Sequence, residues 1–254
     1  MRKRRGRIVD GVLLLDKPVD LSSNHALQRA KRLFDAQKAG HTGTLDPFAT
    51  GLLICCFGRA TKIASKMLEA DKTYVAEIRF GVETDSGDLT GNVVSHFDQP
   101  FEIDAARLEL VLSGFVGVIE QVPPMTSALK HNGKPLYSYA RQGIEIERKA
   151  RQVTIYSIDL LEHAGDRATV KVTCSKGTYI RTLAQDIGRA LGYGAHLVGL
   201  RRTRIGDFDI KDAYDLETLA SLEDIDSALI KLSDLPQELL DGLPSSTQSS
   251  SVHQ

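Results

Sequence analysis

The chain has 254 residues, of which 42 % are hydrophobic and 26 % are charged, and its formal net charge at pH 7 is −1. These values are typical of a soluble globular protein with a sizeable buried core. No apolar run approaches the roughly 20 residues that a membrane-spanning helix needs, and no signal peptide follows the basic N-terminus. We therefore expect a cytoplasmic protein that does not contact membranes.

The cysteines argue against both disulfides and metal binding. The chain has three of them, and an odd count without paired spacing does not fit a disulfide framework. Cys55 and Cys56 are adjacent, which suits neither the spacing of zinc ligands nor a redox pair. We expect these two residues and Cys174 to be buried thiols in strands.

Basic residues cluster although the net charge is close to zero. Five of the first seven residues are basic, and further clusters lie at 148–151 and 201–204, whereas acidic residues gather at 215–226. This distribution fits either an electrostatic footprint for RNA or several unrelated solvated patches.

Hydrophobic periodicity predicts alternating strands and helices in the first part of the chain. In order, they are a buried strand at 12–15, a helix from its cap at Ser22 to Phe34, a loop over 40–51, a strand at 52–57, a short helix at 61–69 and an alternating strand at 72–80. On that last strand, Tyr74 shares the inward face with Ala76 and Ile78.

The remaining elements complete an α+β pattern in which strands outnumber helices. They are a strand at 92–97, a helix at 104–112, a strand at 115–122, paired strands at 152–161 and 167–174, a helix at 179–191 closed by Gly192, a strand within 197–208 and a helix over 216–232. We predict a mixed, mainly antiparallel sheet flanked by helices.

Two segments stand apart from this pattern within the predicted domain of residues 1–234. Residues 123–151 are polar, basic and rich in Tyr, Gly and Pro, which indicates an insertion with a short helix at 136–141. Residues 235–254 are rich in Pro and Ser and are expected to form a disordered tail.

The stretch Gly40–Leu53 carries the strongest chemical signal. It contains three glycines and an Asp-Pro pair. The proline pushes Asp46 into an extended or turn conformation, so its carboxylate is presented from a loop, a common location for catalytic groups. The stretch alone also fits an ordinary aspartate turn in which His41 is incidental.

Several blocks occur in order between about residues 8 and 210 and together resemble the bacterial tRNA pseudouridine synthases of the TruB type. The blocks are Gly11–Pro18 with Ser22-Ser23, Gly40–Leu53, Asp71–Val75, Pro123–Lys130 with Leu136–Gly143, Cys174–Arg181, and Gly194–Leu197 with Leu200–Arg202. An ordered set of this kind is highly specific.

The resemblance implies the pseudouridine synthase fold and the isomerisation of uridine 55 in the TΨC arm of tRNA. It makes Asp46 the nucleophile on an extruded uridine. The reaction breaks the N1–C1′ bond and forms a C5–C1′ bond without oxidation or loss of atoms, so no cofactor or metal is expected. A carboxylate suits attack at C6, attack at C1′ or stabilisation of an oxocarbenium-like sugar.

The resemblance also assigns roles around Asp46. Tyr74 would stack on the uracil and relay the C5 proton, although an ordinary core tyrosine has the same pattern. Arg181, in a first helical turn, would pair with Asp46 and keep it ionised, although it also fits an exposed arginine. Tyr179 and Leu200 would form apolar walls around the base.

Two further residues receive binding roles. The family's counterpart of His41 takes the place of the extruded nucleotide in the base stack, which offsets the few kcal/mol that unstacking costs. Lys17 would either support the active-site loop or contact phosphate.

The insertion would grip an RNA stem-loop, because its basic residues are mixed with tyrosines. The residues expected to contact RNA are Lys130, Lys134, Arg141, Arg148 and, in the later basic cluster, Arg202. The alternative is a solvent-exposed hairpin without RNA contacts.

Many relatives continue into a small C-terminal β domain of the PUA type, and here we expect no complete one. The expected partner is the T stem-loop of tRNA, bound by a monomer. Two other functions compete with this prediction: a non-catalytic tRNA-binding or folding module, and a pseudouridine synthase that acts on another RNA.

Overall fold

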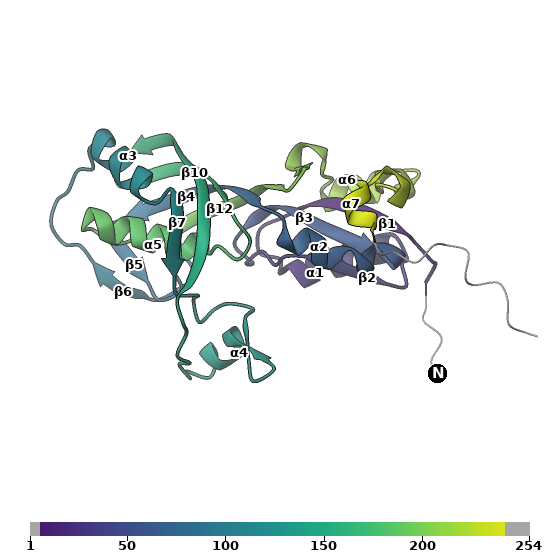
Figure 1. Cartoon of the computed structure of the whole chain (residues 1–254), viewed down its shortest axis with the longest axis horizontal. Helices are drawn as coiled ribbons and strands as arrows, with labels where there is room; N and C mark the ends of the chain where they lie inside the picture. The colour runs from purple at the N-terminus through teal and green to yellow at the C-terminus, as the bar shows by residue number, and fades with distance from the viewer. Residues whose placement is uncertain (1–5, 242–254) are drawn as a thin grey trace, which may run out of the picture.

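A mixed sheet of nine strands runs through both halves of the molecule (Figure 1). The computed structural model describes residues 6–241. The path through the sheet is β1 (Gly11–Lys17), β3 (Thr50–Phe57), β12 (Ala195–Ile205), β4 (Lys72–Phe80), β11 (Arg167–Cys174), β10 (Arg151–Ala164) and β7 (Gly117–Gln121). β2 (Ala39–Thr42) pairs with β3, and β13 (Phe208–Asp209) pairs with β12. Within this sheet only the pairing of β12 with β3 is parallel, so the predicted, mainly antiparallel sheet is confirmed.

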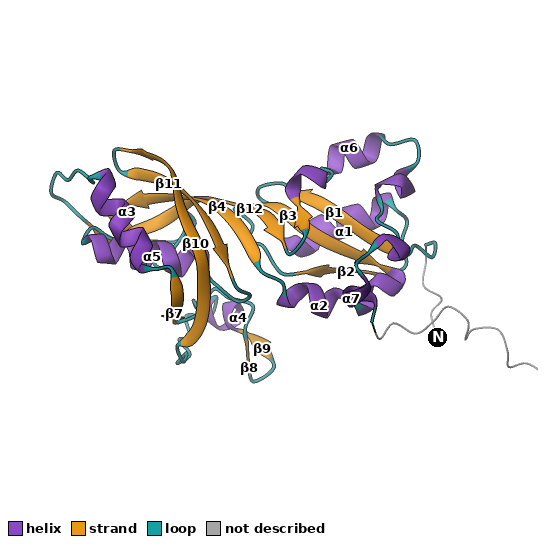
Figure 2. Cartoon of the chain, turned by 45° about the horizontal axis from the view of Figure 1, so that its top comes forward, coloured by secondary structure: helices purple, strands orange, loops and turns teal. Residues whose placement is uncertain are grey.

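The half of the sheet that contains β1, β2 and β3 is covered on both faces (Figure 2). Successive side chains of a strand point to opposite faces, so Leu13 and Leu15 pack toward α1 (Ser23–Leu33), while Leu14 packs on the side of α2 (Ala64–Glu69). Ser22 caps α1 by accepting a hydrogen bond from the backbone N–H of His25, as its position before the helix predicts.

The other half is covered on one face by α3 (Ala105–Gly114) and α5 (Ile180–Leu191). The apolar face of α5 is buried, from Ile180 through Ile187 to Leu191. Gly192 ends this helix with φ 87°, a left-handed conformation that glycine adopts without a steric cost. The predicted helix and its stop signal are therefore confirmed.

The segment between β7 and β10, residues 122–150, projects from the sheet as the insertion (Figure 1). It contains the short strands β8 (Lys130–His131) and β9 (Lys134–Pro135) and the helix α4 (Leu136–Ala140). A second small hairpin, β5 (Val82–Thr84) and β6 (Val93–His96), lies beside α5.

Three local predictions need correction. The loop expected over 40–51 begins as β2 and ends as β3, because Ala39–Thr42 pairs with the buried strand Thr50–Phe57. The helix expected over 216–232 ends early: α6 covers Leu216–Ser221, and the rest of the expected range contains only the short 3-10 turn Ile225–Ala228 and the start of another. The expected tail starts later, because Leu235 is 5 % exposed in the core and α7 (Gln237–Leu240) follows it. Residues 242–254 of that tail lie outside the described part.

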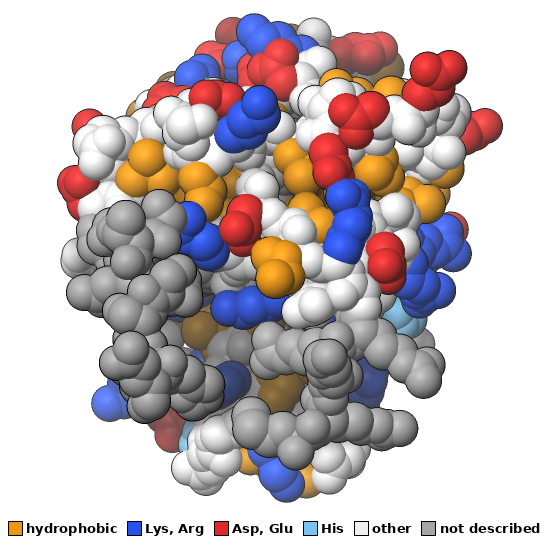
Figure 3. Space-filling view, turned by 90° about the vertical axis from the view of Figure 1, so that its right-hand side faces the viewer, with side chains coloured by type: hydrophobic (Ala, Val, Ile, Leu, Met, Phe, Trp, Pro, Cys, Tyr) orange, Lys and Arg blue, Asp and Glu red, His pale blue; other side chains and the backbone are white. Residues whose placement is uncertain are grey.

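Cys55, Cys56 and Cys174 are buried free thiols, as predicted, and burial raises the pKa of Cys56 and Cys174 to about 12. Acidic and basic side chains are interspersed on the end of the molecule seen in Figure 3. No helix within residues 6–241 is both long and apolar enough to cross a membrane.

Candidate active site

Asp46 lies on the loop that joins β2 to β3, where the two halves of the sheet meet. Neighbouring elements hold this loop at several points. The hydroxyl of Ser23, in α1, accepts a hydrogen bond from the N–H of Leu45 at 2.8 Å and donates one to its carbonyl at 3.0 Å. The N–H of Asp20 donates to the carbonyl of Pro47 at 2.9 Å. The carboxylate is therefore presented from a fixed backbone.

Lys17 supports the same loop from below. Its side chain is 0 % exposed, and Nζ donates to the carbonyls of Pro18 at 2.8 Å, Leu21 at 2.7 Å and Pro47 at 3.3 Å. Burial lowers the pKa of Lys17 to about 8. A side chain this enclosed does not face solvent, where an RNA phosphate would bind. Of the two roles expected for Lys17, the structure therefore favours holding the active-site loop, and the expected contact with substrate needs correction.

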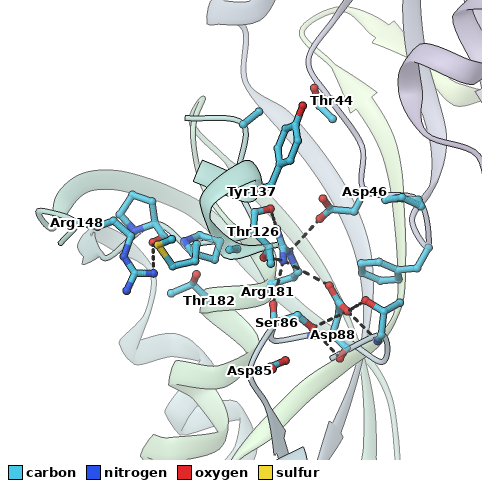
Figure 4. Close-up of a pocket in the computed structure, with 18 of the residues that line it drawn as sticks. Thr44, Asp46, Asp85, Ser86, Asp88, Thr126, Tyr137, Arg148, Arg181 and Thr182 are labelled. Atoms are coloured by element: carbon cyan, nitrogen blue, oxygen red, sulfur yellow. Dashed lines mark hydrogen bonds and ion pairs between the residues drawn. The ribbon is translucent and has the colours of Figure 1, made fainter. Parts of the chain in front are cut away.

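Arg181 organises the centre of the site (Figure 4). Its Nε lies 3.0 Å from Oδ2 of Asp46, and its Nη1 lies 3.5 Å from Oδ2 of Asp88. It also donates to the carbonyl of Ser86 at 3.0 Å and to that of Thr126 at 3.1 Å. With a side chain only 5 % exposed, Arg181 is not the surface arginine that the sequence left open. The structure places Arg181 between the carboxylates of Asp46 and Asp88.

The ionisation of Asp46 is governed by burial and by Arg181. Burial raises the pKa of Asp46, the Arg181 guanidinium opposes this shift, and the nearby Asp88 carboxylate adds to it. The net direction is upward, because the effect of burial exceeds that of the Arg181 guanidinium. The Asp46 side chain is still 33 % exposed, which leaves its carboxylate accessible from the cavity.

Tyr74 and Arg202 face each other across β4 and β12, as register partners. Burial raises the pKa of the Tyr74 hydroxyl, so this group stays protonated at neutral pH. Arg202 donates to the carbonyls of Leu52 at 2.8 Å and Gly43 at 3.1 Å, and its positive charge partly opposes the rise in the pKa of Tyr74. At 2 % exposure, Arg202 is not a surface residue free to bind a phosphate, as its predicted RNA contact requires; its donors instead hold the backbone that lines the cavity.

A cavity of about 640 Å³ opens beside Asp46. Tyr74, Tyr179 and Leu200, the residues predicted to surround the base, line it together with Arg181. His41 also lines it, from strand β2 rather than from a loop. Its Nδ1 is buried and has no hydrogen-bond partner in the described structure. Burial lowers the pKa of His41, which leaves the ring neutral.

A second, larger hollow of about 1420 Å³ lies between the insertion and α5 and shares Asp46, His41 and Arg181 with the first. Arg141 and Arg148 line it. Lys130 and Lys134 lie on the β8–β9 hairpin, outside both hollows, and are exposed. The residues of the insertion that are predicted to contact RNA therefore form two groups: Arg141 and Arg148 line the larger hollow, whereas Lys130 and Lys134 lie on the β8–β9 hairpin.

Asp88 and Thr126 are the functional neighbours that sequence reasoning missed. Asp88 lies in the turn between the predicted strands at 72–80 and 92–97, yet it is 3 % exposed and accepts from Ser86, Thr90 and Arg181. Thr126 follows the Pro-Pro pair of the insertion. No local pattern shows which turn aspartate points inward, so the tertiary contact with Arg181 was needed to identify it.

Two solved structures share the fold of this chain. The crystal structure of a Cbf5-Nop10-Gar1 complex contains a chain 30 % identical to this one, with a TM-score of 0.71; the match covers 89 % of this chain and 61 % of that chain. A structure of an H/ACA RNP bound to a substrate RNA containing 2'-deoxyuridine has 26 % identity and a TM-score of 0.66, over 91 % of this chain and 65 % of that one.

Sequence comparison gives the family. Residues 31–180 match the N-terminal domain of the TruB family of pseudouridylate synthases, and residues 181–240 match the tRNA pseudouridylate synthase B C-terminal domain. The tRNA pseudouridine synthase B of Bordetella pertussis is 64 % identical over 94 % of this chain and 99 % of its own length. That of Dechloromonas aromatica is 58 % identical over 89 % and 74 %. The chain belongs to the TruB family of pseudouridylate synthases, which confirms the resemblance and the predicted fold.

Proposed function

We propose that this enzyme isomerises uridine 55 in the TΨC arm of tRNA to pseudouridine, with Asp46 as the nucleophile. The observation that carries the proposal is the placement of Asp46, whose Oδ2 lies 3.0 Å from the Arg181 guanidinium beside a cavity with a tyrosine wall. Relatives named as tRNA pseudouridine synthase B support the choice of tRNA.

The site supplies the groups that the reaction needs. An ionised Asp46 attacks the extruded nucleotide, and Arg181 holds the rotamer of the carboxylate. Tyr74 stacks on the uracil and, with its protonated hydroxyl, relays the C5 proton. Tyr179 and Leu200 enclose the detached base, which must turn before the C5–C1′ bond forms.

The insertion and His41 prepare the substrate. His41 is a neutral, planar ring with an unpartnered nitrogen, which suits a group that replaces the uridine in the stack. Lys130, Lys134, Arg141 and Arg148 would hold the phosphates of the T stem-loop. In this proposal residues 1–234 form the catalytic domain, which works as a cytoplasmic monomer with the insertion at about 123–151 as its RNA grip.

The decisive experiment measures tritium release from tRNA that carries tritium at uridine C5. Asp46→Asn should lower the rate on the order of 10⁴-fold or more while tRNA still binds, because the amide cannot replace the nucleophile. Asp98→Asn is the matched control, since Asp98 is exposed and lines neither hollow. Full activity in Asp46→Asn would remove the nucleophile assignment. No pseudouridine from the unaltered enzyme would favour a non-catalytic binding module, and pseudouridine elsewhere would redirect the substrate.

A further inference from the structure

Four cationic side chains and one carboxylate, Asp46, line the cavity beside the catalytic loop. Three of the four cations already have carboxylate or carbonyl partners. Arg181 faces two carboxylates, Arg202 bonds to backbone carbonyls, and Lys72 donates to the carbonyls of Leu68, at 2.6 Å, and Ala70. The fourth cation, Arg151, is different.

Arg151 is the first residue of β10, at the point where the insertion returns to the sheet. Its guanidinium carbon lies 5.2 Å from the centroid of the Tyr179 ring, and its Nη2 donates to the carbonyl of Gly177 at 2.8 Å. Gly177 has φ 76°, and a Cβ added there would lie 3.4 Å from Nη2. The face of the Tyr179 ring and the carbonyl of Gly177 therefore hold the guanidinium of Arg151 in one orientation.

The charge of Arg151 has no counterion. Within residues 6–241 it forms no ion pair, and its Nε is shielded from solvent without a hydrogen-bond partner. A donor that has lost water and gained no acceptor is unfavourable, and a nearby anion would relieve this state. The remaining donors of the planar fork suit the two free oxygens of a phosphodiester.

We propose that Arg151 binds a backbone phosphate next to the target uridine while Tyr179 encloses the uracil. This inference rests on the proposed function, because it requires a uridine of RNA in the cavity. The phosphate would supply the counterion that Arg151 lacks. Through this one side chain, the start of β10 at the base of the insertion would be connected to Tyr179 in the wall of the cavity. Arg151 would thus hold the extruded nucleotide by its phosphate, at a fixed distance from Asp46.

The test uses the full chain and three synthetic T stem-loop RNAs. One is unmodified, and the others carry an uncharged methylphosphonate in place of the phosphate on the 5′ or the 3′ side of the target uridine. Affinity and single-turnover pseudouridine formation are measured for the unaltered enzyme, Arg151→Gln and Arg151→Lys. We expect one methylphosphonate to weaken binding by the unaltered enzyme about tenfold or more, and to have no further effect on Arg151→Gln.

Several controls separate the possible outcomes. Arg204→Gln removes an exposed arginine that also donates to a glycine carbonyl at 2.8 Å but lines neither hollow, and it should behave like the unaltered enzyme. Arg151→Lys should restore part of the affinity. If Arg151 only supported Tyr179, the losses from Arg151→Gln and from the methylphosphonate would be additive, which would overturn the proposal. Product formation on unmodified RNA by the unaltered enzyme tests the proposed function separately.

Discussion

Basic side chains have opposite environments behind the Asp46 loop and in the insertion. Behind the loop, Lys17 and Arg202 are 0 % and 2 % exposed, and their donors end on backbone carbonyls. In the insertion, Lys130, Lys134 and Arg141 are exposed, and the described structure pairs none of the three with a carboxylate. The same residue types thus build the site in one region and face solvent in the other.

The difference shows that a cluster of basic residues in the sequence does not identify RNA contacts. A buried cation has lost its hydration and is retained where its donors organise the backbone around a functional group. An exposed cation keeps its water and can exchange it for phosphate, with an affinity that depends on salt. Three predictions test this distinction.

The largest effect is expected for Arg202→Ala. The substitution removes a fully buried side chain and leaves the carbonyls of Leu52 and Gly43 without their donors, so the free energy of unfolding should fall by about 3–5 kcal/mol. Urea unfolding followed by circular dichroism measures this. Arg204→Ala, on the same strand but exposed, should change stability by less than about 0.5 kcal/mol. Equal effects would show that burial does not separate the two arginines.

The second prediction concerns the partly exposed carboxylate of Asp46. Catalysis needs ionised Asp46, and burial raises its pKa, so the single-turnover rate should fall about tenfold per pH unit below a midpoint that lies above the ordinary aspartate pKa. Stability has the opposite sign: a raised pKa in the folded state favours folding at low pH, and this contribution is lost as pH rises through that pKa. A midpoint at or below the ordinary aspartate value, with the protein still folded, would contradict the prediction.

The smallest effect on stability is expected in the insertion. Changing Lys130 and Lys134 together to glutamine should alter the free energy of unfolding by less than about 0.5 kcal/mol, because both side chains are solvated. tRNA binding should weaken, and the dependence of log affinity on log salt concentration should lose a slope of up to about 2. Binding titrations at several salt concentrations measure this slope. An unchanged slope would leave the hairpin as a solvent-exposed element without phosphate contacts.

Much of the fold was predictable because local patterns determine it. The alternation over Lys72–Phe80 and the cap at Gly192 each depend on neighbouring residues, and both predictions are confirmed. The loop at 40–51 was predicted wrongly in part, because its glycines mask the pairing of β2 with β3. The helix expected over 216–232 ends after Ser221, and farther along Ile230 exchanges two backbone hydrogen bonds with Val12 of β1, a long-range pairing that a continuous helix would not allow.

The site was predictable only as far as the family motifs reached. They nominated Asp46, Arg181 and the cavity walls, which the structure brings together. They did not reveal Asp88, because the contact with Arg181 spans 93 residues. Nor did they reveal the burial of Arg202, since Tyr74, its register partner, lies on a strand that is distant in the chain. Long-range contacts of this kind leave no trace in local spacing.

β12 has a further consequence for how the enzyme is made. It lies between β3 and β4, which follow each other closely in the chain but do not pair with each other. Its parallel contact with β3 is the two-residue register Arg201–Thr50 and Arg202–Gly51, and Gly51 has φ 102° with Arg202 too close to admit a Cβ. In a nascent chain that has not yet reached Ala195, Asp46 therefore lies on the half of the sheet with β3, and Tyr74 and Arg181 lie on the half with β4, without the strand that joins the two halves. The catalytic centre is assembled only when one of the last strands leaves the ribosome.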